Sequence, residues 1–178
     1  MNQALPIEVL RPVQDLPFAY LPVEAKHCHH ALRHNAFITR ASQTGINEFD
    51  LIAEVDHINE NFFFDHEIDH IPGMLTANMI RQSVLVVCHL FLGVPFTKKF
   101  LMDNLEIKFH GLAKLNHKLH LYCKLPVLIM KGSFPKKARL FAEVVQDGVS
   151  IASGFIDFRI YDPEAMNRLK EISQLHKS

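Results

Sequence analysis

The sequence lacks net charge, paired cysteines and any apolar run long enough to cross a membrane. Its 19 basic side chains balance 19 acidic ones. This argues against a nucleic-acid-binding protein, because such proteins need clustered Lys and Arg to contact phosphates. The N-terminus has no basic stretch followed by an apolar one, so no signal peptide is predicted. The longest apolar run is interrupted by His89 and is too short for a bilayer. We therefore expect no nucleic acid and no membrane as partner.

The cysteines exclude a further class, the disulfide-stabilised scaffold. Cys28, Cys88 and Cys123 are odd in number, far apart and without C-x-x-C spacing. Such a pattern is typical of reduced thiols, which persist in a reducing compartment. The sequence therefore predicts a cytoplasmic protein.

The chain is long enough for one domain with a substantial core. It has 178 residues, of which 48% are hydrophobic. Prolines recur through residues 1–24, which disfavours regular helix there and predicts an extended segment lying on the domain. The sequence predicts a proline-rich N-terminal extension over residues 1–29, a single folded domain over 30–161 and a C-terminal helical tail over 162–178.

The central stretch joins an acidic, histidine-rich loop to an apolar helix. Residues 62–82 read FFFDHEIDHIPGMLTANMIRQ. Pro72 disfavours the α conformation at Ile71, so the helix is predicted to begin just after this proline. From Val84 to Leu92 the residues are apolar except for His89. A helix that is apolar all round must be buried on all sides.

Polar groups gather where this helix begins. Asn78 shares a face with Arg81 and Gln82, which follow it by three and four residues. Arg81 on a buried helix is costly unless paired, so it should bind an anion or meet a carboxylate. The backbone N–H groups from Gly73 to Leu75 can polarise a carbonyl oxygen. The sequence therefore predicts a binding site where the histidine-rich loop meets the helix.

The remaining segments predict antiparallel strands. These are residues 37–39, 49–57, 100–110, 119–125, 137–146 and 149–160. A turn is expected near Thr44 and Gly45, and Asp147-Gly148 is a strong hairpin signal. Pro163 suits the first position of a terminal helix. The fold class is therefore α+β, with an antiparallel sheet wrapped around a long central helix. One small sheet cannot cover such a helix alone, so we expect a homodimer.

Two histidine-rich segments contain residue types that bind metals. Residues 26–34 read KHCHHALRH, but their spacing matches no standard zinc pattern. The pairs Asp65-His66 and Asp69-His70 precede a Pro-Gly that breaks any helix able to align them. We therefore expect no metal and no cofactor, and we expect some histidines of residues 26–34 to cap neighbouring backbone.

This arrangement of elements is that of the hotdog fold, and the central stretch resembles the A-factor biosynthesis hotdog family. The family pattern is a phenylalanine run, then D-H-x-x-D-H-x-P-G-M, then a helix containing E-A-A-R-Q. The matching residues are Asp65, His66, Asp69, His70, Pro72, Gly73, Met74, Arg81 and Gln82. The resemblance covers roughly residues 30–160 and identifies residues 30–161 as a single hotdog domain.

The resemblance implies action on a fatty acyl (β-ketoacyl) thioester carried by an acyl-carrier protein or CoA. The implied reaction is acyl transfer to a small hydroxylated acceptor similar to dihydroxyacetone phosphate, in synthesis of a γ-butyrolactone-type signal or a related secondary metabolite. Members that make such signals commonly carry two hotdog units, whereas this chain carries one. A homodimer would rebuild the pair.

The resemblance also implies roles for individual residues. The related 3-hydroxyacyl-carrier-protein dehydratases use a loop histidine and a helix acid from the opposite subunit, which match His66 and Asn78. These two are the predicted catalytic residues, although an amide can only hold a carbonyl by hydrogen bonding and cannot exchange a proton at neutral pH. The predicted substrate-binding residues are Gly73, Met74, Arg81, Gln82, Asp69 and His70. Asp69 and His70 could instead brace the loop.

The sequence is compatible with three functions of different classes. The first is the acyl transfer just described. The second is a dehydratase or thioesterase reaction, which Asn78 in the place of the acid disfavours. The third is a non-catalytic module that binds acyl thioesters or acyl-carrier protein, which Asn78 would permit.

Overall fold

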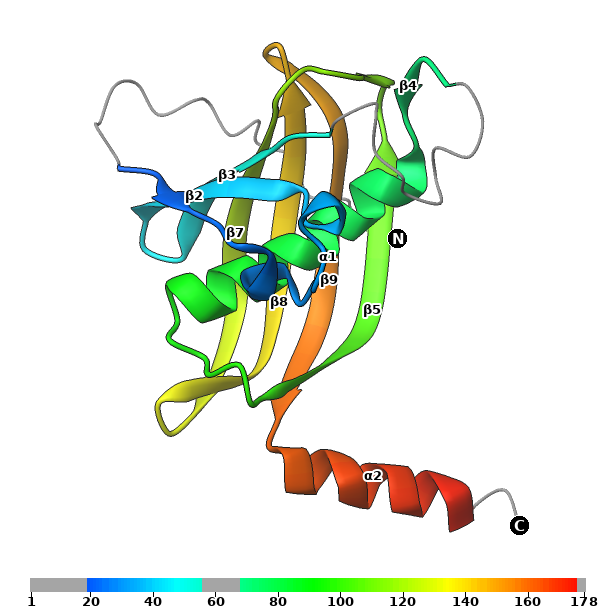
Figure 1. Cartoon of the computed structure of the whole chain (residues 1–178). Helices are drawn as coiled ribbons and strands as arrows, with labels where there is room; N and C mark the ends of the chain where they lie inside the picture. Colours follow the sequence, from blue (N-terminus) through cyan, green and yellow to red (C-terminus); the bar gives the residue numbers. More distant parts are fainter. Residues whose placement is uncertain (1–18, 56–67, 176–178) are drawn as a thin grey trace, which may run out of the picture.

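The structure is a computed structural model that describes residues 19–55 and 68–175 (Figure 1). The strands are β1 (Leu21–Pro22), β2 (Ile38–Gly45), β3 (Glu48–Ala53), β4 (His70–Ile71), β5 (Lys99–Phe109), β6 (Ala113–Lys114), β7 (Leu119–Lys131), β8 (Phe134–Gln146) and β9 (Val149–Tyr161). The 3₁₀ helices are η1 (Ala25–Cys28) and η2 (Arg33–Asn35), and the α-helices are α1 (Gly73–Leu90) and α2 (Pro163–Leu175).

The main sheet has seven strands in the order β1-β2-β3-β7-β8-β9-β5. All neighbouring strands are antiparallel, and α1 lies across one face of the sheet (Figure 1). Side chains alternate between the two faces, so that Leu119 and Leu121 are buried beneath α1 while His120 and Tyr122 project from the outer face. The α+β prediction, with a sheet around a long helix, is confirmed.

Helix α1 begins at Gly73, as predicted from the proline before it. Pro72 has φ −56° and ψ 140°, an extended conformation that a following helix tolerates. Buried side chains then come from several sides of the helix, among them Leu75, Ile80 and Val86, none of which is exposed. This matches the expectation from its apolar composition.

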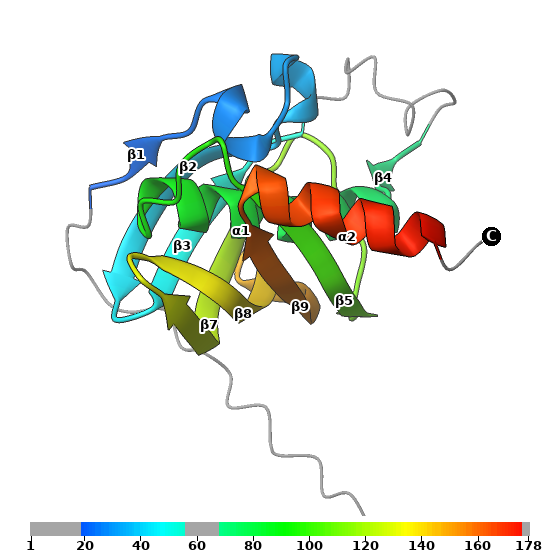
Figure 2. The same ribbon diagram turned by 90° about the horizontal axis from the view of Figure 1, so that it is seen from below.

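The side of α1 that faces away from the sheet is covered by the N-terminal segment. Figure 2 shows α1 between the sheet and the segment that contains β1, η1 and η2. Val23, Cys28 and Phe37 are buried in the same core as the helix. The chain itself therefore supplies the cover that we expected from a second subunit, and burial of α1 is no argument for a homodimer. The homodimer stays a prediction on other grounds.

The two predicted hairpins differ in how closely the structure follows them. Asp147 and Gly148 join β8 to β9 with φ of 51° and 78°, and positive φ at both positions is the geometry of a type I′ turn. Between β2 and β3 the turn lies two residues later than expected, at Ile46 and Asn47, where Asn47 has φ 59°. Asn tolerates this conformation better than most residues, which explains the shift.

The strand lengths also depart from the predictions. β3 ends at Ala53, earlier than the predicted 57, and β7 continues to Lys131, beyond the predicted 125. β7 extends because β8 pairs along it as far as Phe134. Helix α2 begins at Pro163, as predicted. The three cysteines are all free and buried, and the described helices include none that is long and apolar enough to cross a membrane.

Candidate functional site at the start of helix α1

The first turn of α1 presents backbone donors beside a short two-stranded sheet. β4 pairs with β6, which places Ile71 opposite Ala113 and fixes the entry to the helix. The N–H groups of Leu75 and Thr76 donate to the carbonyl of Pro72, at 2.9 and 3.2 Å. The N–H groups of Gly73 and Met74 have no acceptor within the described part of the chain. Two donors at the positive end of a helix are therefore directed outward.

Gly73, at the first position of α1, is closely packed on one side. A Cβ on Gly73 would lie 3.1 Å from Cζ of Phe109, at the end of β5. Met74, the next residue, is 67% exposed. The helix start is thus packed on one side by a ring and open on another.

Asn78 and Arg81 continue the face on which Met74 lies, because they follow it by four and seven residues. Nε of Arg81 donates to Oδ1 of Asn78 at 2.9 Å. A guanidinium N–H of Arg81 lies 3.1 Å from Nε2 of His30, which must therefore accept with its lone pair. Burial lowers the pKa of Arg81 and of His30. The structure thus joins two residues predicted for the site with a histidine that was not.

Arg81 lies against no carboxylate among the described residues. We expected an anion or a carboxylate partner, and the contacts found are to an amide and a neutral imidazole. Removing a guanidinium from water costs free energy that neutral partners offset only in part. Arg81 is therefore a half-buried cation that a bound anion would stabilise.

Gln82 lies on the core side of α1. Its side chain has no exposure. Oε1 accepts from the N–H of Phe37 and Nε2 donates to the carbonyl of Asn35, both at 2.8 Å. Both ends of the amide thus hold the N-terminal segment on the helix. Gln82 was predicted to bind substrate, and this placement supports a positioning role instead.

The loop before α1 is described only from residue 68. Nδ1 of His70 lies 2.7 Å from Oδ1 of Asp69, so these two adjacent side chains contact each other. That they brace the loop stays a prediction. Asp69 is exposed, and the contact lowers the pKa of its carboxyl group. His66, the predicted catalytic histidine, lies outside the described residues, as does its neighbour Asp65.

Histidines from the N-terminal segment line the other half of α1. Nδ1 of His27 accepts from the N–H of Glu24 at 3.0 Å, which confirms that one of them caps backbone. Nε2 of His29 lies 2.8 Å from Nε2 of His89, whose Nδ1 lies 2.6 Å from the carbonyl of Val94. His89 must donate through Nδ1, so its Nε2 accepts from His29. Burial, followed by the electrostatic effects of His89 and Arg81, lowers the pKa of His29 to about 4, which favours the neutral form of this ring.

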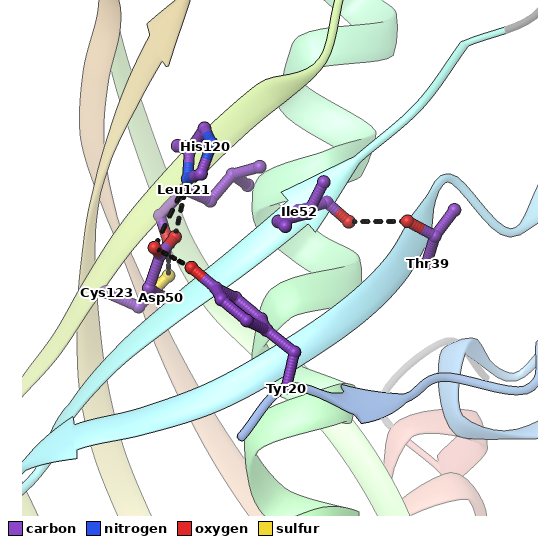
Figure 3. A network of polar contacts seen from close by, with 7 residues as sticks. All are labelled: Tyr20, Thr39, Asp50, Ile52, His120, Leu121 and Cys123. Atoms are coloured by element: carbon purple, nitrogen blue, oxygen red, sulfur yellow. Dashed lines mark hydrogen bonds and ion pairs between the residues drawn. The ribbon is translucent and has the colours of Figure 1, made fainter. Parts of the chain in front are cut away.

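A second polar cluster lies on the outer face of the sheet and was missed by the sequence analysis. Nδ1 of His120 lies 3.1 Å from the buried carboxylate of Asp50, which also accepts from the hydroxyl of Tyr20 (Figure 3). The hydrogen bond to Asp50 raises the pKa of His120, and burial with the same carboxylate raises that of Tyr20. Aspartate is unusual inside a strand, so Asp50 within the predicted strand 49–57 was a feature of the sequence that could have indicated this cluster. Its partners lie 30 and 70 residues away, so no local pattern could identify them.

No metal site is apparent in the part of the chain that the structure describes. No group of three histidine, cysteine or acidic side chains comes together there. Three histidines of residues 26–34 have other partners instead: His27 contacts Phe96, His29 contacts His89 and His30 contacts Arg81.

The family follows from comparison with known sequences. The profile described as the A-factor biosynthesis hotdog domain matches residues 14–162. The chain belongs to this family. The match begins before residue 30, and it includes β1 and η1 of the hotdog domain.

A curated relative of this A-factor-type domain comes from Streptomyces coelicolor (strain ATCC BAA-471 / A3(2) / M145). It is named 2-oxo-3-(phosphooxy)propyl 3-oxoalkanoate synthase and is 26% identical over 154 residues. The alignment covers 84% of this chain and 49% of the relative. The chain therefore spans about half the length of the curated relative that it matches.

Solved structures confirm the hotdog fold. The dehydratase heterocomplex ApeI:P from Xenorhabdus doucetiae matches with a TM-score of 0.64 at 14% identity, over 85% of this chain and 98% of that one. A hot-dog-like protein from Thermanaerovibrio acidaminovorans gives 0.51 at 11% identity, over 72% and 92%. A hypothetical thioesterase with coenzyme A from Streptococcus pneumoniae TIGR4 gives 0.50 at 10% identity, over 68% and 87%.

The groups at the start of α1 are chemically able to hold a carbonyl and an anion on one helix face. Gly73 and Met74 offer N–H groups, and a pair of such donors stabilises a developing oxyanion. Arg81 holds the oxygen of Asn78, so the NH₂ group of that amide is the end presented to a ligand. A glutamate at position 78, as in the family pattern, would pair with Arg81 and neutralise it. Asn78 therefore leaves the guanidinium charge available.

Proposed function

We propose that this hotdog domain transfers the acyl group of a β-ketoacyl thioester to a small phosphorylated hydroxy acceptor, in synthesis of a γ-butyrolactone-type signal or a related secondary metabolite. The observation that carries the proposal is Arg81, a half-buried cation without a carboxylate among the described residues, on the face of α1 that begins with two outward N–H groups. A guanidinium binds phosphate through paired, charge-assisted hydrogen bonds. The relative's name, which includes a phosphooxypropyl group, supports the same acceptor class.

In the proposed reaction the acceptor hydroxyl attacks the thioester carbonyl. The N–H groups of Gly73 and Met74 stabilise the oxyanion that forms, and the NH₂ of Asn78 orients the carbonyl. His66 takes the proton of the hydroxyl and returns it to the departing thiolate, for which an unperturbed histidine pKa is suitable. A C–O bond forms as the C–S bond breaks, so the products are an ester and a free thiol.

The experiment is mass spectrometry of the full chain with β-ketoacyl thioesters of several lengths, with and without a triose phosphate. We expect an acylated triose phosphate from the wild type, and His66→Ala is expected to lower turnover by about 10²-fold or more, the usual scale for loss of a general base. Equal turnover by wild type and His66→Ala with every thioester would reject the proposal.

A non-catalytic binding module is the second candidate, and Asn78 is the observation that favours it. An amide cannot exchange a proton, so a dehydratase-like mechanism has no acid at this position. In this case the wild type shows no turnover, and His66→Ala keeps acyl-thioester affinity within about tenfold. Gain of hydrolysis or dehydration by Asn78→Glu would instead indicate a site that once had this activity.

We further propose a cytoplasmic homodimer whose sheets join edge to edge through β5. This strand is the last in the sheet and exposes Leu101, Met102 and Phe109. An unpaired edge strand with exposed apolar side chains is suited to pairing with a second copy. A homodimer would also supply the two hotdog units that the family resemblance leads us to expect. Sedimentation at micromolar concentration should show a dimer, and a stable monomer would reject it.

A further inference from the structure

A pocket of about 600 Å³ lies at the end of α1 opposite Gly73. It is bordered by the beginning of β5, the beginning of α2 and the N-terminal segment. Three lysines line it, Lys26, Lys98 and Lys99, together with Phe96, Phe100 and Met166. No acidic side chain is among the described residues that line it. Its volume is in the range that holds a small organic ligand.

The positive charge of the pocket is only partly neutralised. Lys98 forms an ion pair with Asp162, and Lys26 lies 2.9 Å from the exposed carboxylate of Glu24. Lys99 is exposed and contacts no carboxylate within the described residues. Its charge is among those that lower the pKa of His29, a further lining residue. The pocket thus favours an anion, and Lys99 is the group best placed to contact it.

The pocket also offers an aromatic surface. The ring of Phe96 stacks on His89, with centroids 4.4 Å apart and an interplanar angle of 25°. Phe96 is nevertheless 49% exposed, so part of the ring remains open to a ligand. Phe100 packs edge-on against His29 and His89 behind it. A flat ring can stack on Phe96 while a charged group of the same ligand meets Lys99.

Resting on the proposed function, we propose that this pocket binds the nucleotide end of coenzyme A, with adenine on Phe96 and the phosphates on Lys99 and Lys26. The ligand combines a flat base with several negative charges, which matches the two properties of the pocket. CoA is also a carrier of the acyl thioester that the proposed reaction consumes. The pocket would then hold the carrier, while the helix start holds the thioester.

The position of the pocket on β5 connects it to the reaction site. Lys99 begins this strand and Phe109, which packs on Gly73, ends it. In an antiparallel β5–β5 pairing of the proposed homodimer, the beginning of β5 in one subunit would lie toward the end of β5 in the other. CoA bound at the pocket of one subunit would then extend toward the helix start of the other.

The test is calorimetric titration of the full chain with CoA, adenosine 3′,5′-bisphosphate and pantetheine. CoA and the bisphosphate should both bind, and pantetheine should bind at least tenfold more weakly than CoA. Lys99→Gln and Phe96→Leu should each weaken CoA binding by about tenfold, the effect of losing one charge-assisted hydrogen bond or one stacked ring. The matched control is Lys118→Gln, which removes the same charge at the opposite end of the sheet and should leave CoA affinity unchanged.

Two outcomes would overturn the inference. One is equal affinity for CoA and pantetheine. The other is binding of a phosphopantetheinylated carrier protein that depends on Lys99 while free CoA fails to bind, since the lysines then form a protein-docking surface. Either result leaves the proposed acyl transfer intact if acyl-carrier thioesters are still converted to product. Conversely, CoA binding without turnover would reject the acyl transfer and keep the pocket.

Discussion

Arginines on the outer face of the sheet have carboxylate partners, whereas the arginine on α1 has neutral partners among the described residues. On the sheet, Arg139 pairs with Asp157 at 2.7 Å and Arg159 with Asp103 at 2.6 Å. On the helix, Arg81 meets only an amide and an imidazole among the described residues. Paired charges stabilise the fold and produce little electrostatic potential at the surface, whereas a half-buried charge without a carboxylate partner attracts an anion. The sheet charges are therefore structural, and the helix charge is the one suited to function.

The histidines also differ between the outer face of the sheet and α1. His120 lies beside Asp50 and its pKa is raised. His29, His30 and His89 have no carboxylate partner among the described residues, and burial lowers the pKa of each. The protonated form of histidine is therefore favoured at His120 and disfavoured at the three histidines along α1. The difference arises because His120 has the carboxylate of Asp50 beside it.

The largest expected effect separates Arg81 from Arg139. Arg81→Gln should lower kcat/KM by about 10²-fold or more, because it removes the charge proposed to hold the phosphate, and should change the free energy of unfolding little. Arg139→Gln should leave kcat/KM unchanged and lower the free energy of unfolding only slightly, because Asp157 loses its partner at a partly exposed site. Steady-state kinetics and urea unfolding of both variants measure the contrast. If the two variants lose activity equally, the division between the faces does not hold.

A smaller effect is expected at the buried carboxylate of the outer face. Asp50→Asn removes the charge that His120 and Tyr20 share, and hydrogen bonds to a buried charged group contribute about 2 kcal/mol. Urea unfolding should show a loss of this size. The matched control is Glu48→Gln, which breaks the exposed contact of Glu48 with Lys124 and should cost under about 1 kcal/mol. Similar losses in both variants would mean that the burial of Asp50 does not matter.

The smallest effect is a pH dependence of opposite sign in the two histidine groups. The raised pKa of His120 gives stability that is full below pH 6.5 and is lost as pH rises through the folded-state value. The lowered pKa of His29 gives stability that is full above pH 6.5 and is lost as pH falls toward about 4. Each effect should amount to a few degrees of Tm at most, since both rings are partly exposed.

Melting curves from pH 4.5 to 8.5 measure these slopes. His29→Gln should flatten the acid side of the profile and His120→Gln the neutral-to-alkaline side, so each variant is the control for the other. If one of these substitutions flattened the profile on both sides, the assignment of opposite pKa shifts to His29 and His120 would be wrong.

Local sequence determined the elements and the position of the candidate site. Pro72 and Gly73 set the beginning of α1, and Asp147 with Gly148 set the β8–β9 turn, because both depend on backbone preferences of adjacent residues. Alternation along residues 119–125 identified which side chains face the core. Asn78 and Arg81 could be placed together because three residues separate them on one helix.

Only the tertiary structure decided what these residues contact. His30 reaches Arg81 across 51 positions, Gln82 holds Phe37 across 45 and His120 meets Asp50 across 70. The N-terminal segment, expected to be an extension, covers α1 in place of a second subunit. None of these contacts has a local signature, because each depends on which distant surfaces the core brings together. These distant neighbours also determine the pKa of each buried ionisable group. They therefore determine whether an arginine has a carboxylate partner, as Arg139 does, or neutral partners, as Arg81 does.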